Sequence, residues 1–275
     1  MTPGSRGTLP CAGPLPQKHA CRSARHTAQA SPVTGTADNR RPSEEEALTT
    51  TDTTDRPDIR DMAVVHRVFR REVGLLARMV RAVPAGNTAR ARIVAGHFAD
   101  YGLILHLHHA GEDELAWPLL LARVEPEAET VLRMGAQHEA LDATLDEAAR
   151  RIPAWTSAPS PETAAPLADA IAAHGAALRE HMDDEEAHVV PLIAEYLTAA
   201  EWERLAERFG QEAPNSKLLF FLGLMLEEAS SAELAMMLGN LPAPARLLWH
   251  TIGERQYKRK IRRIRADILA DERGW

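Results

Sequence analysis

One segment with metal-binding character occurs twice in the sequence. The first copy runs from His108 to Glu112 and on to a Pro-Leu pair at 118–119, and the second runs from His181 to Glu185 and on to a Pro-Leu pair at 191–192. In each copy a histidine precedes a glutamate by four residues, and residues four apart lie on the same face of an α-helix. Each copy is therefore a candidate chelating pair.

A second correspondence precedes each copy. His66 lies 42 residues before His108, and His138 lies 43 residues before His181. Two helix pairs that each supply a histidine and then a His-x-x-x-Glu pair predict a pseudo-symmetric four-helix bundle with a metal site inside. The candidate metal ligands are His66, His108, Glu112, His138, His181 and Glu185.

The residue types of this set restrict the metal. Both cysteines, Cys11 and Cys21, lie near the N-terminus, so the remaining ligands are imidazoles and carboxylates. These suit iron, manganese or zinc. A buried carboxylate without a partner costs several kcal/mol, and a bound cation removes that cost. Four imidazoles and two carboxylates exceed the needs of one tetrahedral ion and predict two ions with the carboxylates bridging them.

Apolar residues recur in steps of three and four along most of the chain, which predicts an all-α fold. Helices are expected over 58–81, 87–118 (with Pro118 kinking or closing the helix), 126–152 and 167–192, a linker over 153–161, and shorter helices over 201–209, 217–228, 231–238 and 243–271. Residues 1–56 are rich in Pro, Ser, Thr and Gly and predict a disordered tail. We expect an up-down four-helix bundle over 57–200 and a helical extension over 201–275.

Composition indicates a cytoplasmic protein. The formal net charge is −7, which argues against a general nucleic-acid binder, and no apolar run is long enough for a signal peptide or a membrane helix. We therefore expect neither a membrane nor a nucleic-acid partner, and interpret the basic segment 255–265 as a solvated helix. The apolar segment 220–226 needs cover from the bundle or from a second subunit, so a homo-oligomer through the C-terminal helices stays open.

These residues resemble the hemerythrin-like family, also described as HHE cation-binding domains. The similarity covers about 60–198 and is carried by His66, H-H-A-G-E-D-E-L-A-W-P at 108–118, Q-H-E at 137–139 and H-M-D-D-E-E at 181–186. The resemblance implies a bundle that holds a non-heme di-iron centre, with Glu112 and Glu185 bridging two iron ions and the four histidines as terminal ligands. Oxygen carriers of the family have His-x-x-x-His on the third helix, where this chain has His138 and Asp142. Fewer imidazoles favour irreversible oxidation over reversible oxygen binding.

Three functions remain open at this point. The leading hypothesis is a di-iron protein that binds or reacts with O2, NO or peroxide in sensing or detoxification. The alternatives are a di-iron enzyme with peroxidase, catalase-like or oxidase activity, and a helical interaction module with a structural metal. The spacing does not decide whether His109, Asp142, His97 or His174 joins the site.

Overall fold

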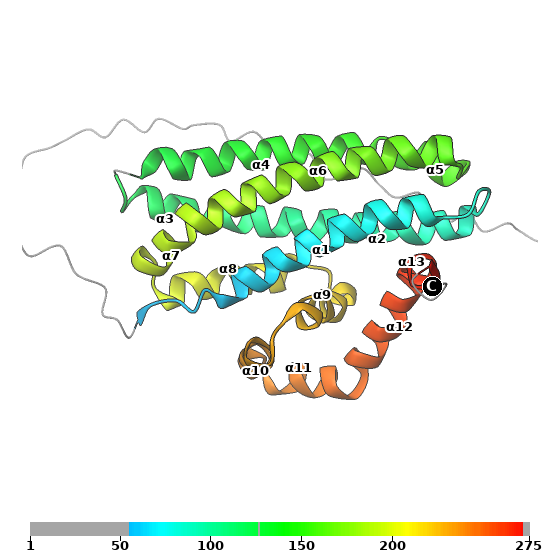
Figure 1. The fold of residues 1–275 in the computed structure, drawn as a ribbon. Helices are drawn as coiled ribbons and strands as arrows, with labels where there is room; N and C mark the ends of the chain where they lie inside the picture. Colours follow the sequence, from blue (N-terminus) through cyan, green and yellow to red (C-terminus); the bar gives the residue numbers. More distant parts are fainter. Residues whose placement is uncertain (1–54, 126, 272–275) are drawn as a thin grey trace, which may run out of the picture. The chain divides into compact units, whose positions relative to one another are not determined.

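Four long helices form the bundle in the computed structural model, which describes residues 55–125 and 127–271 (Figure 1). They are α1 (Arg60–Ala82), α2 (Thr88–Gly111), α4 (Ala128–Ala149) and α6 (Pro161–His188). Helix α1 packs on α2 and α6, and α6 packs on α4. No strand occurs among the described residues, so the predicted all-α bundle is confirmed. The tail predicted for 1–56 lies outside the described residues, apart from positions 55 and 56.

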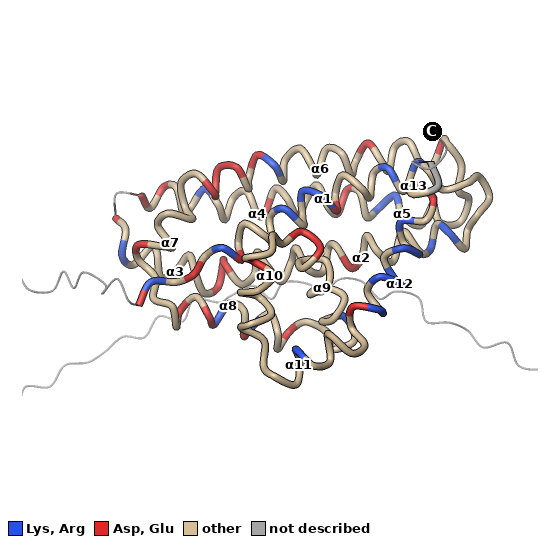
Figure 2. Tube along the Cα trace, turned by 60° about the horizontal axis from the view of Figure 1, so that its bottom comes forward, with Lys and Arg blue, Asp and Glu red and all other residues tan. Residues whose placement is uncertain are grey.

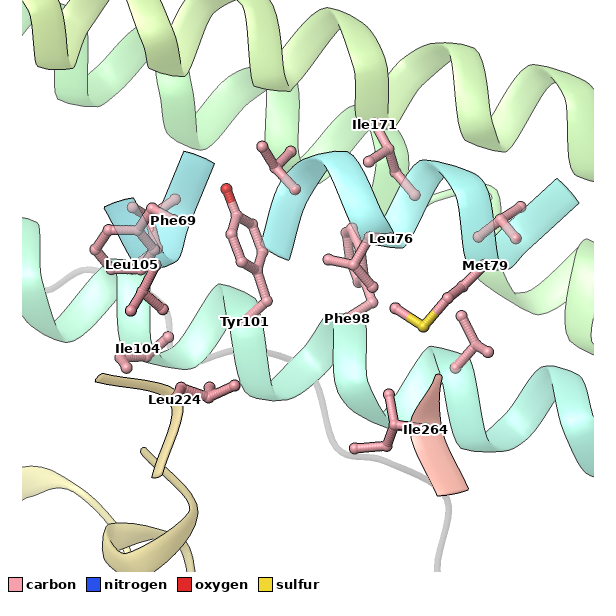
Figure 3. Packing of buried hydrophobic residues seen from close by; sticks show 14 of the residues in the cluster. Phe69, Leu76, Met79, Phe98, Tyr101, Ile104, Leu105, Ile171, Leu224 and Ile264 are labelled. Carbon is pink, nitrogen blue, oxygen red and sulfur yellow. The ribbon is translucent and has the colours of Figure 1, made fainter. Parts of the chain in front are cut away.

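The bundle core is built from apolar side chains at the predicted helical spacing. Phe69 and Leu76 of α1 have no exposed surface, and Ile171 of α6 is 1% exposed (Figure 3). Burying one such side chain contributes about 1.5–3 kcal/mol. Gly86, with φ of +76°, makes the turn between α1 and α2, where other residues would be strained. No helix in the described part has the length and apolar character that crossing a membrane requires.

The second predicted helix does not end at Pro118. A π-helical turn, η2 (Glu112–Ala116), follows α2 directly, and the chain continues as α3 (Trp117–Leu121). Pro118 lies in the first turn of α3, where the missing N–H would have no helical partner in any case. The irregularity therefore precedes the proline and begins at Glu112, a candidate metal ligand.

The predicted linker over 153–161 is partly helical. Helix α5 (Ile152–Ser157) has Pro153 in its first turn and buries Trp155 completely. The prediction was wrong because proline is tolerated at a helix start and the burial of one tryptophan outweighs the turn-forming composition. Helix α7 (Val190–Tyr196) likewise begins with Pro191 in its first turn.

The extension contains further helices. They are α8 (Ala199–Glu212), α9 (Asn215–Glu228), α10 (Ser231–Asn240), α11 (Ala243–Leu248), the π-helical turn η3 (Trp249–Gly253), α12 (Glu254–Ile264) and α13 (Ala266–Asp271). Helix α9 packs on α1, and Phe220 and Phe221 are buried, so the bundle of the same chain covers the apolar segment 220–226. A Cβ at Gly223 would lie 2.3 Å from the ring of Tyr257, so the contact between α9 and α12 requires glycine there.

Buried charges join the extension to the bundle. Arg90 of α2 is 8% exposed, donates to the carbonyl oxygens of Arg263 and Ile264, and pairs with Asp267. Glu72 of α1 accepts a hydrogen bond from Arg265 at 2.6 Å. These contacts connect α12 and α13 to α1 and α2 by directional bonds as well as by apolar packing.

Candidate metal centre

Seven side chains converge inside the bundle in two groups. The first group is His66, His108, Glu112 and Glu185, and the second is His109, His138 and His181. Within each group the potential ligand atoms lie within 4.8 Å of one another. All six ligands predicted from the spacing are therefore brought together, with His109 added. Each of the four long helices, or the turn that continues it, contributes at least one of these residues.

The two carboxylates face both groups. Oε1 of Glu112 lies 3.3 Å from Nε2 of His108, and its Oε2 lies 3.6 Å from Nε2 of His138. Oε2 of Glu185 lies 3.4 Å from Nε2 of His66 and 3.6 Å from Nε2 of His181. Ligand atoms bound about 2.1 Å from one ion lie roughly 3.0–3.4 Å apart at octahedral or tetrahedral angles. The separations of 3.3 and 3.4 Å fall within this range and those of 3.6 Å lie just outside it, and each glutamate lies between the two groups of histidines.

Three histidines are oriented by a hydrogen bond at Nδ1. The pairs are His66 with Glu186 (2.8 Å), His138 with Asp113 (2.8 Å) and His181 with Gln137 (2.9 Å). An acceptor at Nδ1 places a proton there and leaves the Nε2 lone pair for a metal. These hydrogen bonds thus select the tautomer that a metal needs.

The repeat in the sequence extends to these outer contacts. In each copy the ligand glutamate is followed by a second acid, Asp113 in one and Glu186 in the other. Asp113 accepts from His138, and Glu186 accepts from His66. Each copy therefore supplies two candidate ligands and orients the histidine that precedes the other copy, which extends the pseudo-symmetry beyond the ligands.

The atoms that face the centre make no hydrogen bond. They are Nε2 of His66, His108, His138 and His181, both ring nitrogens of His109, and both carboxylate oxygens of Glu112 and Glu185. A buried polar atom without a partner costs free energy that a native fold normally avoids. Bound cations would accept a lone pair from each carboxylate and from one nitrogen of each of these imidazoles. The residues present therefore fit a metal centre with imidazole and carboxylate ligands.

The two buried carboxylates of the site also favour a bound cation. Burial and the neighbouring Glu185 raise the pKa of Glu112 well above its ordinary value. Burial also opposes ionisation of Glu185, but the surrounding histidines, above all His66, lower its pKa. Burial lowers the pKa of His109 and keeps its imidazole neutral, the form that binds metals. Two adjacent buried carboxylates can ionise together only when positive charge lies between them.

Comparison with known families agrees with this geometry. A family model described as the hemerythrin HHE cation binding domain matches residues 58–193. Residues 58–193 belong to the hemerythrin family. Helices α8 to α13 lie beyond this hemerythrin domain. No curated protein and no solved structure matched the chain.

His109 is one of four residues in the hemerythrin domain whose place in the site the sequence did not decide. Its ring stacks on that of His138, with centroids 4.0 Å apart and planes at 10°. It precedes Glu112 by three residues, and a three-residue spacing also places two side chains on one helix face. That spacing is the feature of the sequence that could have identified His109 as part of the site. The number of imidazoles that face the centre is therefore five rather than the expected four.

The other undecided residues lie outside both groups. Asp142 is half-buried and belongs to neither. His97 donates from Nε2 to Glu72 at 2.7 Å, within the contacts between bundle and extension. His174 is hydrogen-bonded to Tyr101 at 2.9 Å and to Thr144 at 2.8 Å, and burial lowers its pKa to about 4. Both histidines are committed to contacts away from the candidate centre.

Proposed function

We propose that the hemerythrin domain holds two non-heme iron ions and binds or reacts with O2, NO or peroxide, in sensing or detoxification. The observation that carries this proposal is the set of buried nitrogen and oxygen atoms without hydrogen bonds, which belong to seven side chains in two adjoining groups. Bound cations would satisfy these buried groups, and the imidazole and carboxylate types present are those that iron binds.

The two groups differ in a way that supports a ligand-binding role. The first group has two imidazoles and the second has three, while both carboxylates face both groups. The first ion would thus have four protein ligands and the second five. For ions that prefer about six ligands, more positions stay open at the first ion. We place the exchangeable ligand there, beside His66 and His108.

The surroundings favour a small ligand. His66, Glu112 and Glu185 have no exposed surface. The ring of Phe69 lies 5.3 Å from that of His108, and the ring of Trp117 lies 6.1 Å from that of His138. A site this enclosed favours a diatomic molecule or peroxide over a larger substrate, which would have to displace these rings.

The fifth imidazole affects how the proposed centre would react with O2. Neutral ligands stabilise ferric iron less than carboxylates do, so a centre with five imidazoles is better suited to reversible O2 binding than the four-imidazole set expected from the sequence. An enzyme with peroxidase, catalase-like or oxidase activity would use the same open position, and it is distinguished by repeated turnover.

The test is the metal content and the ultraviolet-visible spectrum of protein purified under low oxygen. We expect about two irons per chain, as in di-iron bundles, and a spectrum that changes on addition of air, NO or peroxide. Zinc, or a single ion per chain without a spectral response, would contradict the proposal. Continued consumption of peroxide by catalytic amounts of protein would select the enzyme alternative. Unfolding of the helices on chelation would select the structural-metal alternative.

A further inference from the structure

The helices α10 and α11 present an apolar surface to solvent. No residue of either helix is buried. Of the large apolar side chains exposed among the described residues, most lie in this part of the chain: Leu234, Leu247, Leu248 and Ile252, against Leu121 and Leu132 elsewhere. Single exposed leucines are ordinary, but a cluster of them marks an interaction site.

A row of arginines follows directly on α12. Arg255, Arg259 and Arg262 are exposed, and their spacing of four and three residues places them on one face of the helix. Figure 2 shows basic residues along much of α12. The opposite face, with Ile261 and Ile264, is buried. In the described part of the chain no carboxylate pairs with these three arginines, whereas Lys258 pairs with Glu254, Lys260 with Asp100 and Arg265 with Glu227.

The apolar and basic parts belong to one helical run. Trp249 and Glu254, the residues that join α11, η3 and α12, have helical backbone angles, so the chain stays helical from Ala243 to Ile264. Figure 1 shows that the run bends at η3, so α11 and α12 point in different directions. Its first part exposes Leu247, Leu248 and Ile252, and its second part exposes the arginines.

We propose that this surface, formed by α10, α11 and α12, binds the face of an anionic lipid bilayer. The exposed leucines and Ile252 would enter the boundary between headgroups and acyl chains, and Arg255, Arg259 and Arg262 would bind the lipid phosphates. A bilayer surface offers apolar and anionic groups side by side, which is the combination that this helical run presents. This proposal departs from the sequence-based interpretation of the basic segment 255–265 as a solvated helix, and a surface contact needs no membrane-spanning segment.

Other binding partners would contact either the arginines or the leucines of this surface, but not both. A nucleic acid would pair with the arginines but would leave the leucines in water. A second copy of the chain that covered the leucines would leave the arginines without an anionic partner. The chain carries a net charge of −7, so an anionic bilayer would repel its other faces and favour approach through the arginine row.

The experiment is co-sedimentation of the full chain with phosphatidylcholine vesicles that contain or lack phosphatidylglycerol. We expect binding only to the anionic vesicles, weakened by salt. The triple variant R255Q/R259Q/R262Q should lower the partition coefficient about 100-fold, since each arginine near an anionic surface contributes about 1 kcal/mol, or about fivefold. The double variant Leu247→Ser and Leu248→Ser should lower it at least about tenfold.

Matched controls come from the bundle. Leu132 is 63% exposed against 65% for Leu247, and the side chain of Arg150 is 64% exposed, so Leu132→Ser and Arg150→Gln should leave binding unchanged. Circular dichroism checks that all variants stay helical. No binding to anionic vesicles, or binding that neither set of variants weakens, would overturn the proposal. Binding to duplex DNA that depends on the arginines alone, or self-association lost in the leucine variant without any vesicle binding, would assign the surface to those partners instead.

Discussion

Replacing His109 with alanine tests whether this residue is a metal ligand. The second group would keep His138 and His181 but lose the imidazole stacked on His138. We expect the second ion to bind more weakly than in the wild type and to be removed at lower chelator concentration, because it loses one of its five protein ligands while the first ion keeps all of its own.

The size of the effect on stability follows from linkage. An ion present at about 1,000 times its dissociation constant stabilises the native state by about 4 kcal/mol. For a chain of this size, 1 kcal/mol corresponds to about 2–4 °C in Tm. Weaker binding of the second ion should therefore narrow the gap in Tm between metal-loaded and metal-free protein, and its complete loss would narrow the gap by about 8–16 °C. The cavity left by the truncation destabilises both forms, so the gap and not the Tm itself is the informative quantity.

The assay is elemental analysis at increasing chelator concentrations, together with calorimetry with and without a chelator. His174→Ala is the matched control, since His174 is 1% exposed against 4% for His109 but binds Tyr101 and Thr144 instead of facing the centre. This variant should lower the Tm of both forms alike and leave the gap unchanged. If His109→Ala releases its ions at the same chelator concentrations as the wild type and keeps the wild-type gap, His109 is a packing residue and the five-imidazole centre is refuted.

Three further predictions follow from the same contacts. Glu112→Ala should abolish binding of the ion pair and leave the circular dichroism spectrum helical, because Glu112 faces both groups, and two ions per chain in that variant would exclude bridging. Gln137→Leu should weaken metal binding about 10–100-fold in a chelator competition, since Gln137 orients His181. Burial opposes ionisation of Glu72, but the hydrogen bond from His97 and the charges of Arg265 and Arg71 lower its pKa from 4.5 to about 2. Its ionised form therefore stabilises the fold above about pH 4.5 and loses this contribution of roughly 3 kcal/mol as the pH falls toward 2, and Glu72→Gln should remove this part of the acid-unfolding curve of the metal-free protein.

The bundle and most of the site could be predicted because both depend on local spacing. The His-x-x-x-Glu pairs place their side chains one helical turn apart whatever surrounds them, and apolar steps of three and four fix which face of each helix turns inward. Histidines His66 and His138 follow from the same steps, since each lies on the apolar stripe of its own helix. These inferences need no knowledge of the tertiary contacts.

The parts that were missed depend on contacts between distant segments. Helix α5 forms where composition predicts a linker, because Trp155 finds a buried position against the bundle. Nothing in the sequence of α2 indicates that Arg90 is buried. Its burial comes from α12 and α13, at the far end of the chain. Whether a polar residue is paired, exposed or a ligand is decided by such partners, and spacing along one helix does not contain that information.

The difference between the two candidate ion positions arises from one place in the repeat. The two copies match at the ligand histidines His108 and His181, at the ligand glutamates, and at the acids that orient the neighbouring imidazoles. At the position after the ligand histidine they differ: the first copy has His109, and the second has Met182, which is fully buried in the apolar core. A strictly symmetric bundle would give both ions the same number of ligands. Because only one copy carries the additional imidazole, the proposed second ion would have one protein ligand more than the first, which would leave the first more accessible to a small ligand.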